Sequence, residues 1–142
     1  MAALKASVVK KTFLTAAQFN VLELKAKGLT QAEIARRLKT SRANISILER
    51  RARENIARAE QTIKLAARLR APVVLEVKAG TDIFNVPNSL YKAADAAKIR
   101  VKLTAPDIVA KIRDEARDNI SGRSVVKPFW LAVARDGNVL IT

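Results

Sequence analysis

The side chains best suited to bind a ligand are basic and cluster in one short segment, RRLKTSRANISILERR, residues 36–51. Guanidinium and ammonium groups at this density favour contact with phosphates or another polyanion. Small and apolar side chains lie between them, and such side chains can approach the edge of a nucleic-acid base. The segment therefore predicts binding of a polyanion, and the elements around it must form the binding surface.

Catalytic chemistry is not indicated elsewhere in the chain. The sequence contains no Cys and no His, which excludes disulfides, Cys/His zinc sites, thiol nucleophiles and imidazole bases. The C-terminal acids form no close pair within a glycine-rich or apolar motif, and no Walker or dinucleotide fingerprint is present. We therefore expect no enzyme activity, no cofactor and no metal. The acids considered are Glu76, Asp82, Asp95, Asp107, Asp114, Glu115 and Asp118.

Positive charge is concentrated in the N-terminal half of the 142-residue chain, whose formal net charge is +14. Residues 1–70 hold 16 Lys or Arg against 5 Asp or Glu, whereas residues 71–142 hold 11 against 8. This asymmetry predicts a basic domain, residues 1–71, and a nearly balanced domain, residues 72–142. No apolar run could span a membrane and the first ten residues lack a signal pattern, so we expect a cytoplasmic protein.

Local signals predict three helices in the basic half. Thr15 with Gln18, and Thr30 with Glu33, have the spacing of capping boxes, which begin helices over about 16–27 and 31–38. Gly28 stands where the first of these helices needs a left-handed residue. After the short turn KTS, Ser41 is expected to cap a third helix.

The third helix is predicted to have a buried face and an exposed face. Ile45, Leu48, Ala52 and Ile56 recur at helical spacing on one side, with the residues of the expected contact surface on the other. Recognition helices commonly contact bases through their first residues, while neighbouring basic residues contact phosphates. The expected DNA-binding residues are Arg36, Arg37, Lys39, Thr40, Ser41, Arg42, Ala43, Asn44, Ser46, Ile47, Arg50 and Arg51.

Residues 14–52, LTAAQFNVLELKAKGLTQAEIARRLKTSRANISILERRA, resemble the helix-turn-helix of sigma-factor region 4 and of LuxR-type regulators. The segment that continues through residue 62, SRANISILERRARENIARAEQT, residues 41–62, resembles more narrowly the Tfx family of archaeal DNA-binding regulators. This resemblance implies an N-terminal helix-turn-helix and a small C-terminal domain. It also implies that Ser41 is the helix cap, that Ala43, Ser46 and Ile47 face DNA together with Arg42, and that Ile45 and Leu48 are core residues.

The third helix has no stop signal before Pro72, so we expect one long connecting helix. Ala52, Ile56, Ala59, Ile63 and Ala66 alternate by four and three, which is the spacing of a coiled-coil seam. Leu65 and Leu69 form a second apolar stripe. One stripe is expected to meet a second copy of the chain in a homodimer, and packing of the helix on its own domain is the alternative.

The C-terminal half predicts a small α/β domain in the order β-α-β-α-β-β, so the fold class of the whole chain is α+β. The expected elements are a strand at 72–79, helices at 87–98 and 105–118, a strand at 99–103, and a hairpin over 129–142 turning at Asp136-Gly137. A mostly parallel or mixed sheet is expected. Between the second helix and the hairpin, the loop NISGRSVVKP could hold a small anionic effector at Ser121, Gly122, Arg123 and Ser124, or could be a solvated turn.

These features favour a sequence-specific regulator of transcription that binds double-stranded DNA as a homodimer. Two alternatives remain open from the residues. An RNA-binding or ribosome-associated basic protein would bind structured RNA more tightly than duplex DNA. A small enzyme domain targeted to DNA would require a convergent acidic or anion-binding pocket in the C-terminal half.

Overall fold

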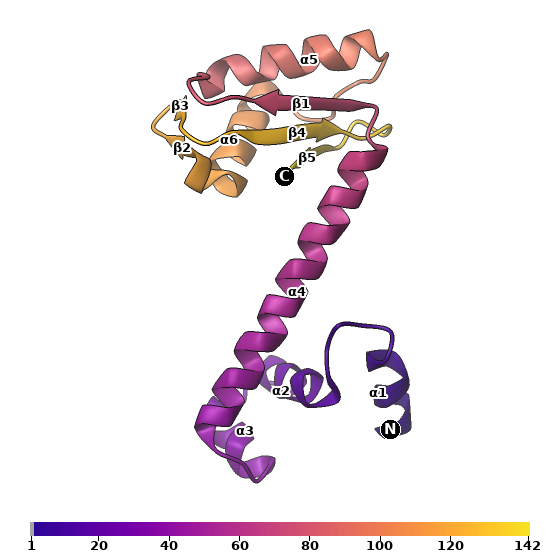
Figure 1. Ribbon diagram of the computed structural model, residues 1–142, viewed down its shortest axis with the longest axis vertical. Helices are drawn as coiled ribbons and strands as arrows, with labels where there is room; N and C mark the ends of the chain where they lie inside the picture. The colour runs from indigo at the N-terminus through magenta and orange to yellow at the C-terminus, as the bar shows by residue number, and fades with distance from the viewer. Residues whose placement is uncertain (1) are drawn as a thin grey trace. The chain divides into compact units, whose positions relative to one another are not determined.

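The computed structural model describes residues 2–142 and combines helices with small antiparallel sheets (Figure 1), which confirms the α+β class. Residues 1–61 and 62–142 form two compact units, and the division falls inside helix α4 (Arg42–Arg70). Met1, where the predicted N-terminal domain begins, lies outside the described residues. The domain boundary at 71/72 stays a prediction. None of the helices in residues 2–142 combines the length and the apolar character that crossing a bilayer requires.

The first unit is helical, as predicted. It contains α1 (Ala2–Val9), α2 (Ala16–Ala26), α3 (Gln31–Arg37) and the first part of α4. Both capping boxes are present, since the Thr15 and Thr30 hydroxyls accept from the backbone N–H groups of Gln18 and Glu33. Gly28 adopts a φ of 92° after α2, the left-handed conformation that its position predicted.

A compact apolar core joins α2, α3 and α4. Val21, Ile34, Ala35 and Ile45 are buried together, with Leu24, Leu29 and Leu48 packed around them. The Asn55 amide donates to Gln18 Oε1 over 3.3 Å and so ties α4 to the N-terminus of α2. This core fixes the orientation of α3 and of the first turns of α4.

The second unit is built on a three-stranded antiparallel sheet in the order β1-β4-β5. Its strands are β1 (Val73–Val77), β4 (Phe129–Val133) and β5 (Val139–Ile141). The helices are α5 (Val86–Ala96) and α6 (Ala105–Glu115), with short 3₁₀ turns at Ile83–Asn85 (η1) and Arg117–Asn119 (η2). A two-stranded hairpin, β2 (Ile120–Ser121) and β3 (Ser124–Val125), completes the unit.

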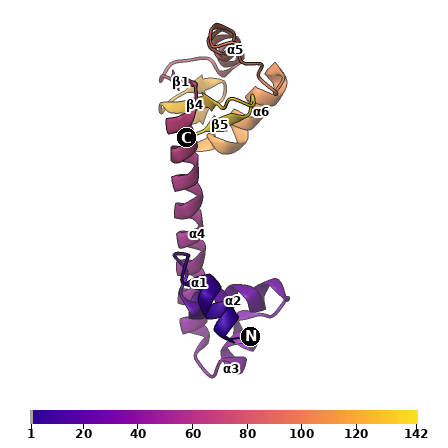
Figure 2. The ribbon, with the colours of Figure 1, turned by 90° about the vertical axis from the view of Figure 1, so that its right-hand side faces the viewer.

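The two faces of this sheet have different neighbours. Every second residue of a strand points to the same face of the sheet. On one face, Val77, Leu131 and Ile141 pack with Leu90 of α5 and Ile112 of α6. Figures 1 and 2 show α5 and α6 beside the sheet. On the opposite face, the guanidinium of Arg68 at the end of α4 lies 4.4 Å from the centroid of the Trp130 ring.

Two predictions for the C-terminal half are wrong. The sheet is antiparallel, because β1 pairs directly with β4 in the register Leu75↔Leu131. Residues 99–103 form no strand, although Ile99, Val101 and Leu103 pack against the core as the alternation predicted. The alternation marks a half-buried irregular segment. The one backbone hydrogen bond that it forms to the hairpin, from Lys102 N–H to Gly137 O at 3.0 Å, does not build a ladder.

Helix limits in the second unit shift slightly from the prediction. The helix predicted over 105–118 ends at Glu115, because Ala116 leaves helical geometry at φ −111° and ψ 30°. The predicted start of that helix is confirmed, since Thr104 and Asp107 form a capping box. The predicted C-terminal hairpin is also confirmed, with β4 and β5 joined through Asp136 and Gly137.

Candidate nucleic-acid interface

The break between α3 and α4 is short and tightly bonded. Lys39 adopts a left-handed φ of 55°, and the Thr40 N–H donates to Ala35 O over 2.9 Å. The Ser41 hydroxyl accepts from the Asn44 N–H over 3.0 Å and caps α4, as predicted. Because the turn returns at once to a capped helix, the first turns of α4 are held at a fixed angle to α3.

The start of α4 presents an exposed face opposite its buried one. Ile45 is fully buried, whereas Ala43, Ser46, Ile47 and Arg50 are exposed and follow helical spacing. Ile47 is 40% exposed, so the core of the unit covers this large apolar residue only in part. All twelve residues expected to bind DNA are exposed, which makes each one accessible to a ligand.

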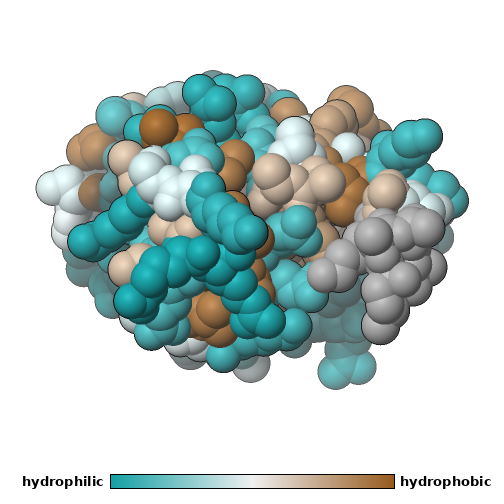
Figure 3. Space-filling view, turned by 90° about the horizontal axis from the view of Figure 1, so that it is seen from below, coloured by the Kyte–Doolittle hydropathy of each residue, from teal (hydrophilic) through white to brown (hydrophobic). Residues whose placement is uncertain are grey.

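Most cations of this surface lack an acidic partner. In the part of the chain that the structure describes, no carboxylate lies within 4.0 Å of Arg36, Arg37, Lys39, Arg42 or Arg51. Arg50 pairs with Glu54 at 4.0 Å. Seen from below Figure 1, the near surface is largely hydrophilic with small hydrophobic patches between (Figure 3). Such a surface suits an extended array of negative charges.

Asn44 has a second task that the sequence does not reveal. Its side-chain amide donates to the Thr40 hydroxyl over 3.0 Å, while its backbone N–H is bound by Ser41. The side chain therefore braces the turn between α3 and α4 in this structure. Its predicted contact with DNA stays a prediction.

Glu49 is a structural residue of the interface that the sequence analysis missed. Its carboxylate accepts from the Gln31 amide at 2.9 Å and from Arg53 at 2.9 Å, and lies 3.9 Å from Lys25. The side chain is only 12% exposed, and these bonds connect α2, α3 and α4. The hydrogen bond from Gln31, opposed by burial and assisted by Arg53 and Lys25, lowers the pKa of Glu49 below 4.5. The signal in the sequence that could have identified Glu49 is an acidic residue on the buried side of the basic helix α4.

We expect Glu49→Gln to destabilise the first unit by about 1 kcal/mol at pH 7, because it removes a charged acceptor. A lowered folded-state pKa gives stability that is present above the unfolded value near 4.5 and is lost as the pH falls through the folded value. The difference between wild type and variant should therefore shrink toward pH 3. Urea denaturation followed by circular dichroism measures it, with Glu54→Gln as the exposed control. Equal losses for the two variants would contradict the assignment.

The predicted anion loop is the tight turn of the β2–β3 hairpin. Ser121 and Ser124 pair across it, and Gly122 adopts a φ of 61°. The Arg123 guanidinium forms an ion pair with Asp82, with Nε 2.9 Å from Oδ2, and lies 4.7 Å from the centroid of the Phe84 ring. This pairing lowers the pKa of Asp82 and raises that of Arg123. An anion at this turn would have to compete with a carboxylate, and its binding stays a prediction.

Several of the C-terminal acids form structural contacts. Asp82 caps η1 by accepting from the Phe84 N–H, Asp107 caps α6, and Glu115 pairs with Lys111 at 2.8 Å. Within residues 2–142, no three acidic side chains converge as metal ligands would. Asp82, Asp107 and Glu115 are therefore engaged in contacts that hold the fold together.

Comparison with known proteins identifies close relatives. A family model described as "DNA_binding protein, TFX, C-term" matches residues 59–141. A Methanocaldococcus jannaschii protein named "Putative transcriptional regulatory protein" is 42% identical over 132 residues, covering 93% of this chain and 96% of that protein. A protein of the same description from Pyrococcus horikoshii is 50% identical over 106 residues, covering 75% and 74%. The "DNA-binding protein Tfx" of Methanothermobacter thermautotrophicus is 35% identical over 132 residues, covering 93% and 96%.

Proposed function

We propose that this chain, which belongs to the Tfx family of DNA-binding proteins, is a transcriptional regulator whose helix α4 reads base sequence in the major groove of double-stranded DNA. The observation that carries this proposal is the surface at the α3–α4 break. An exposed strip of small and apolar side chains lies among cations, most of which have no carboxylate within 4.0 Å among residues 2–142. No reaction is included in the proposal.

The two kinds of side chain have different roles. Ala43, Ser46 and Ile47 lie on one face of the first two turns of α4, where a recognition helix approaches base edges. Methyl-bearing side chains suit contact with thymine methyl groups, and the serine hydroxyl suits either a donor or an acceptor. In this proposal Arg36 and Arg37, in the last turn of α3, bind phosphates on one side of the groove. The phosphate contacts supply affinity and position, and the base contacts supply specificity.

We expect Arg37→Ala to weaken binding to all duplex sequences alike. Loss of one phosphate contact should reduce the slope of log K against log salt by roughly one unit, without changing the preferred sequence. Fluorescence anisotropy on cognate and scrambled duplexes at several salt concentrations measures both quantities. Arg135→Ala, which removes an exposed arginine of the second unit, is the matched control. A loss confined to the cognate duplex would show that Arg37 reads bases instead.

We also propose that the regulator is a homodimer formed through the second unit. In the part of α4 that belongs to the second unit, Ile63 is 69% exposed, and Leu65 and Leu69, the second apolar stripe, are 51% and 87% exposed on another side of the helix. A second copy packed against the side of α4 that carries Ile63 would remove that apolar surface from water. The seam predicted from the sequence cannot begin at Ala52, because Ala52 is fully buried within the first unit.

We expect Ile63→Asp to shift the protein toward monomers, because the buried charge would lack a partner. The operator should be pseudo-palindromic, with half-sites about 34 Å or a multiple apart. Light scattering of wild type, Ile63→Asp and the control Val126→Asp measures the assembly state. A monomeric wild type at high micromolar concentration would remove the basis for the dimer.

Tighter binding to structured RNA than to any duplex DNA would favour the alternative function, that of an RNA-binding or ribosome-associated basic protein.

A further inference from the structure

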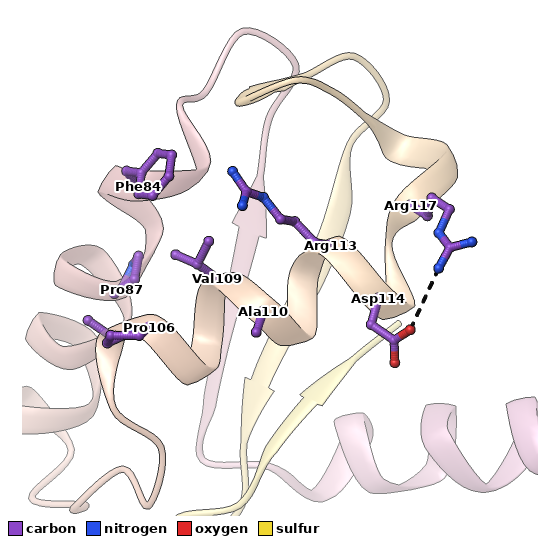
Figure 4. Close-up of a pocket in the computed structure, with 9 residues that line it drawn as sticks. Phe84, Pro87, Pro106, Val109, Ala110, Arg113, Asp114 and Arg117 are labelled. Carbon is purple, nitrogen blue, oxygen red and sulfur yellow. Dashed lines mark ion pairs between the residues drawn. The ribbon is translucent and has the colours of Figure 1, made fainter.

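A cavity of about 700 Å³ opens between α6 and the segment that runs from η1 into α5, entirely within the second unit (Figure 4). Its walls come from two elements that the core holds in place, since Ile83 and Leu90 on one side and Ile108 and Ile112 on the other are fully buried. The space is within the range of small-molecule sites in proteins. Neither the DNA-reading surface nor the proposed dimer surface uses these residues.

The cavity has an apolar body and a cationic edge. Phe84 and Pro87 line one side, and Pro106, Val109 and Ala110 line the other, with Arg113 extending from α6 toward Phe84 (Figure 4). Phe84 is 47% exposed, although Ile83 and Val86 on either side of it are buried in the core. Such exposure is unusual for a large aromatic side chain. An apolar surface next to a guanidinium fits a ligand that has both characters.

The arginines around the cavity differ in their availability. Arg123, over the Phe84 ring, is already held by Asp82, and Arg117 lies 3.9 Å from Asp114. The guanidinium of Arg113 lies 5.4 Å from the Phe84 ring centroid, and within residues 2–142 no carboxylate lies within 4.0 Å of it. One cationic group at the cavity is therefore left for an anion.

We propose that this cavity binds a small amphipathic carboxylate, with its apolar body against Phe84, Pro106 and Val109 and its carboxylate paired with Arg113. A guanidinium offers two parallel N–H donors that match the two oxygens of a carboxylate. The apolar walls supply burial for a hydrocarbon or aromatic body, which free acetate or phosphate lacks. Because the cavity rim carries a single unpaired cation, a monoanion fits better than a polyanion. The proposal is independent of DNA binding.

Titration of the ¹⁵N-labelled full chain with 4-phenylbutyrate, followed by amide chemical shifts without DNA, tests this proposal. We expect saturable shifts at Phe84, Val109, Ala110 and Arg113, with a dissociation constant of roughly millimolar order for so small a probe. The neutral analogue 4-phenylbutyramide should bind about tenfold more weakly, because it cannot form the charge-assisted pair. Acetate, which lacks the apolar body, should produce no saturable shifts at these residues.

Three variants separate the contributions. Arg113→Gln should lower the affinity for 4-phenylbutyrate to that of the amide, about tenfold, whereas the control Arg135→Gln should leave it unchanged. Ala110→Trp, at an exposed position that a folded chain tolerates, should fill the cavity and abolish binding of both compounds. Equal affinity for acid and amide, or shifts that map outside η1 and α6, would overturn the proposal. So would ligand-free shifts at these residues that depend on protein concentration, since a second copy would then occupy the cavity.

Discussion

Replacing Ile47 with Glu is expected to abolish the preference of the protein for its cognate sequence while leaving the helix folded. Ile47 lies on the face of α4 opposite Ile45 and outside the buried cluster of the first unit, so the substitution leaves that cluster intact. On the bound duplex, a carboxylate would replace an apolar contact and approach the negatively charged groove. Specific binding commonly exceeds non-specific binding by about 10³-fold or more, and most of that ratio should be lost. Binding-site selection followed by anisotropy on the selected duplex measures the loss.

Two further variants show whether position 47 or charge alone matters. Ser46→Glu, one residue earlier on the same face, should have a comparable effect. Val126→Glu adds the same charge at an exposed apolar position of the second unit and should reduce affinity for all sequences only slightly. Retention of full sequence preference by both the Ile47 and the Ser46 variants would show that the first turns of α4 do not read DNA.

The helices of the first unit could be predicted because their signals are local. A capping box is completed within four residues, as at Thr15 and Thr30, and the left-handed Gly28 follows the helix that it ends. The burial of Ile45 and the exposure of Ile47 follow from helical period alone. Each of these features depends on residues that are close in sequence, so it can be predicted from one sequence alone.

The sheet of the second unit could be predicted only in part, because strand pairing is not local. The Asp136-Gly137 dipeptide between two apolar segments predicted the hairpin of β4 and β5. Nothing near Val73–Val77 indicates that this strand pairs antiparallel with Phe129–Val133, more than fifty positions later. The segment 99–103 has the alternation of a strand, and it lacks the neighbour that a strand requires. Alternation of apolar and polar residues indicates that one side of a segment is buried. A strand also needs a neighbouring strand with which its backbone forms hydrogen bonds.

The candidate sites show the same division. The exposed basic surface follows from composition and helical period, so its residues could be named in advance. Glu49 could not, because its role depends on Gln31 and Lys25, which reach it from two other helices. Likewise, the pairing of Arg123 with Asp82 joins residues 41 positions apart. Contacts of this kind decide which charges are structural and which remain for a ligand.

The β4–β5 turn supports a second prediction with a large effect, in which Gly137→Ala destabilises the second unit by about 2–4 kcal/mol. Gly137 is buried and adopts a φ of 90°, a conformation that side chains rarely accept. A Cβ atom there would also overlap the backbone carbonyl of Arg100 and lie 3.3 Å from Lys102 Cγ. Because the Gly137 carbonyl accepts from the Lys102 N–H, the turn cannot move away without breaking that bond.

Gly80→Ala separates the cost of the backbone conformation from the cost of the overlap. Gly80 has the same φ of 90°, but an added Cβ would meet nothing within 4 Å, so a loss of about 1 kcal/mol is expected. Urea denaturation followed by the fluorescence of Trp130, the single tryptophan of the chain, reports on the second unit in both variants. The difference between them measures how rigidly segment 99–103 is held against the hairpin. Equal losses at the two glycines would mean that this segment yields and that its contact with the turn is not a fixed part of the fold.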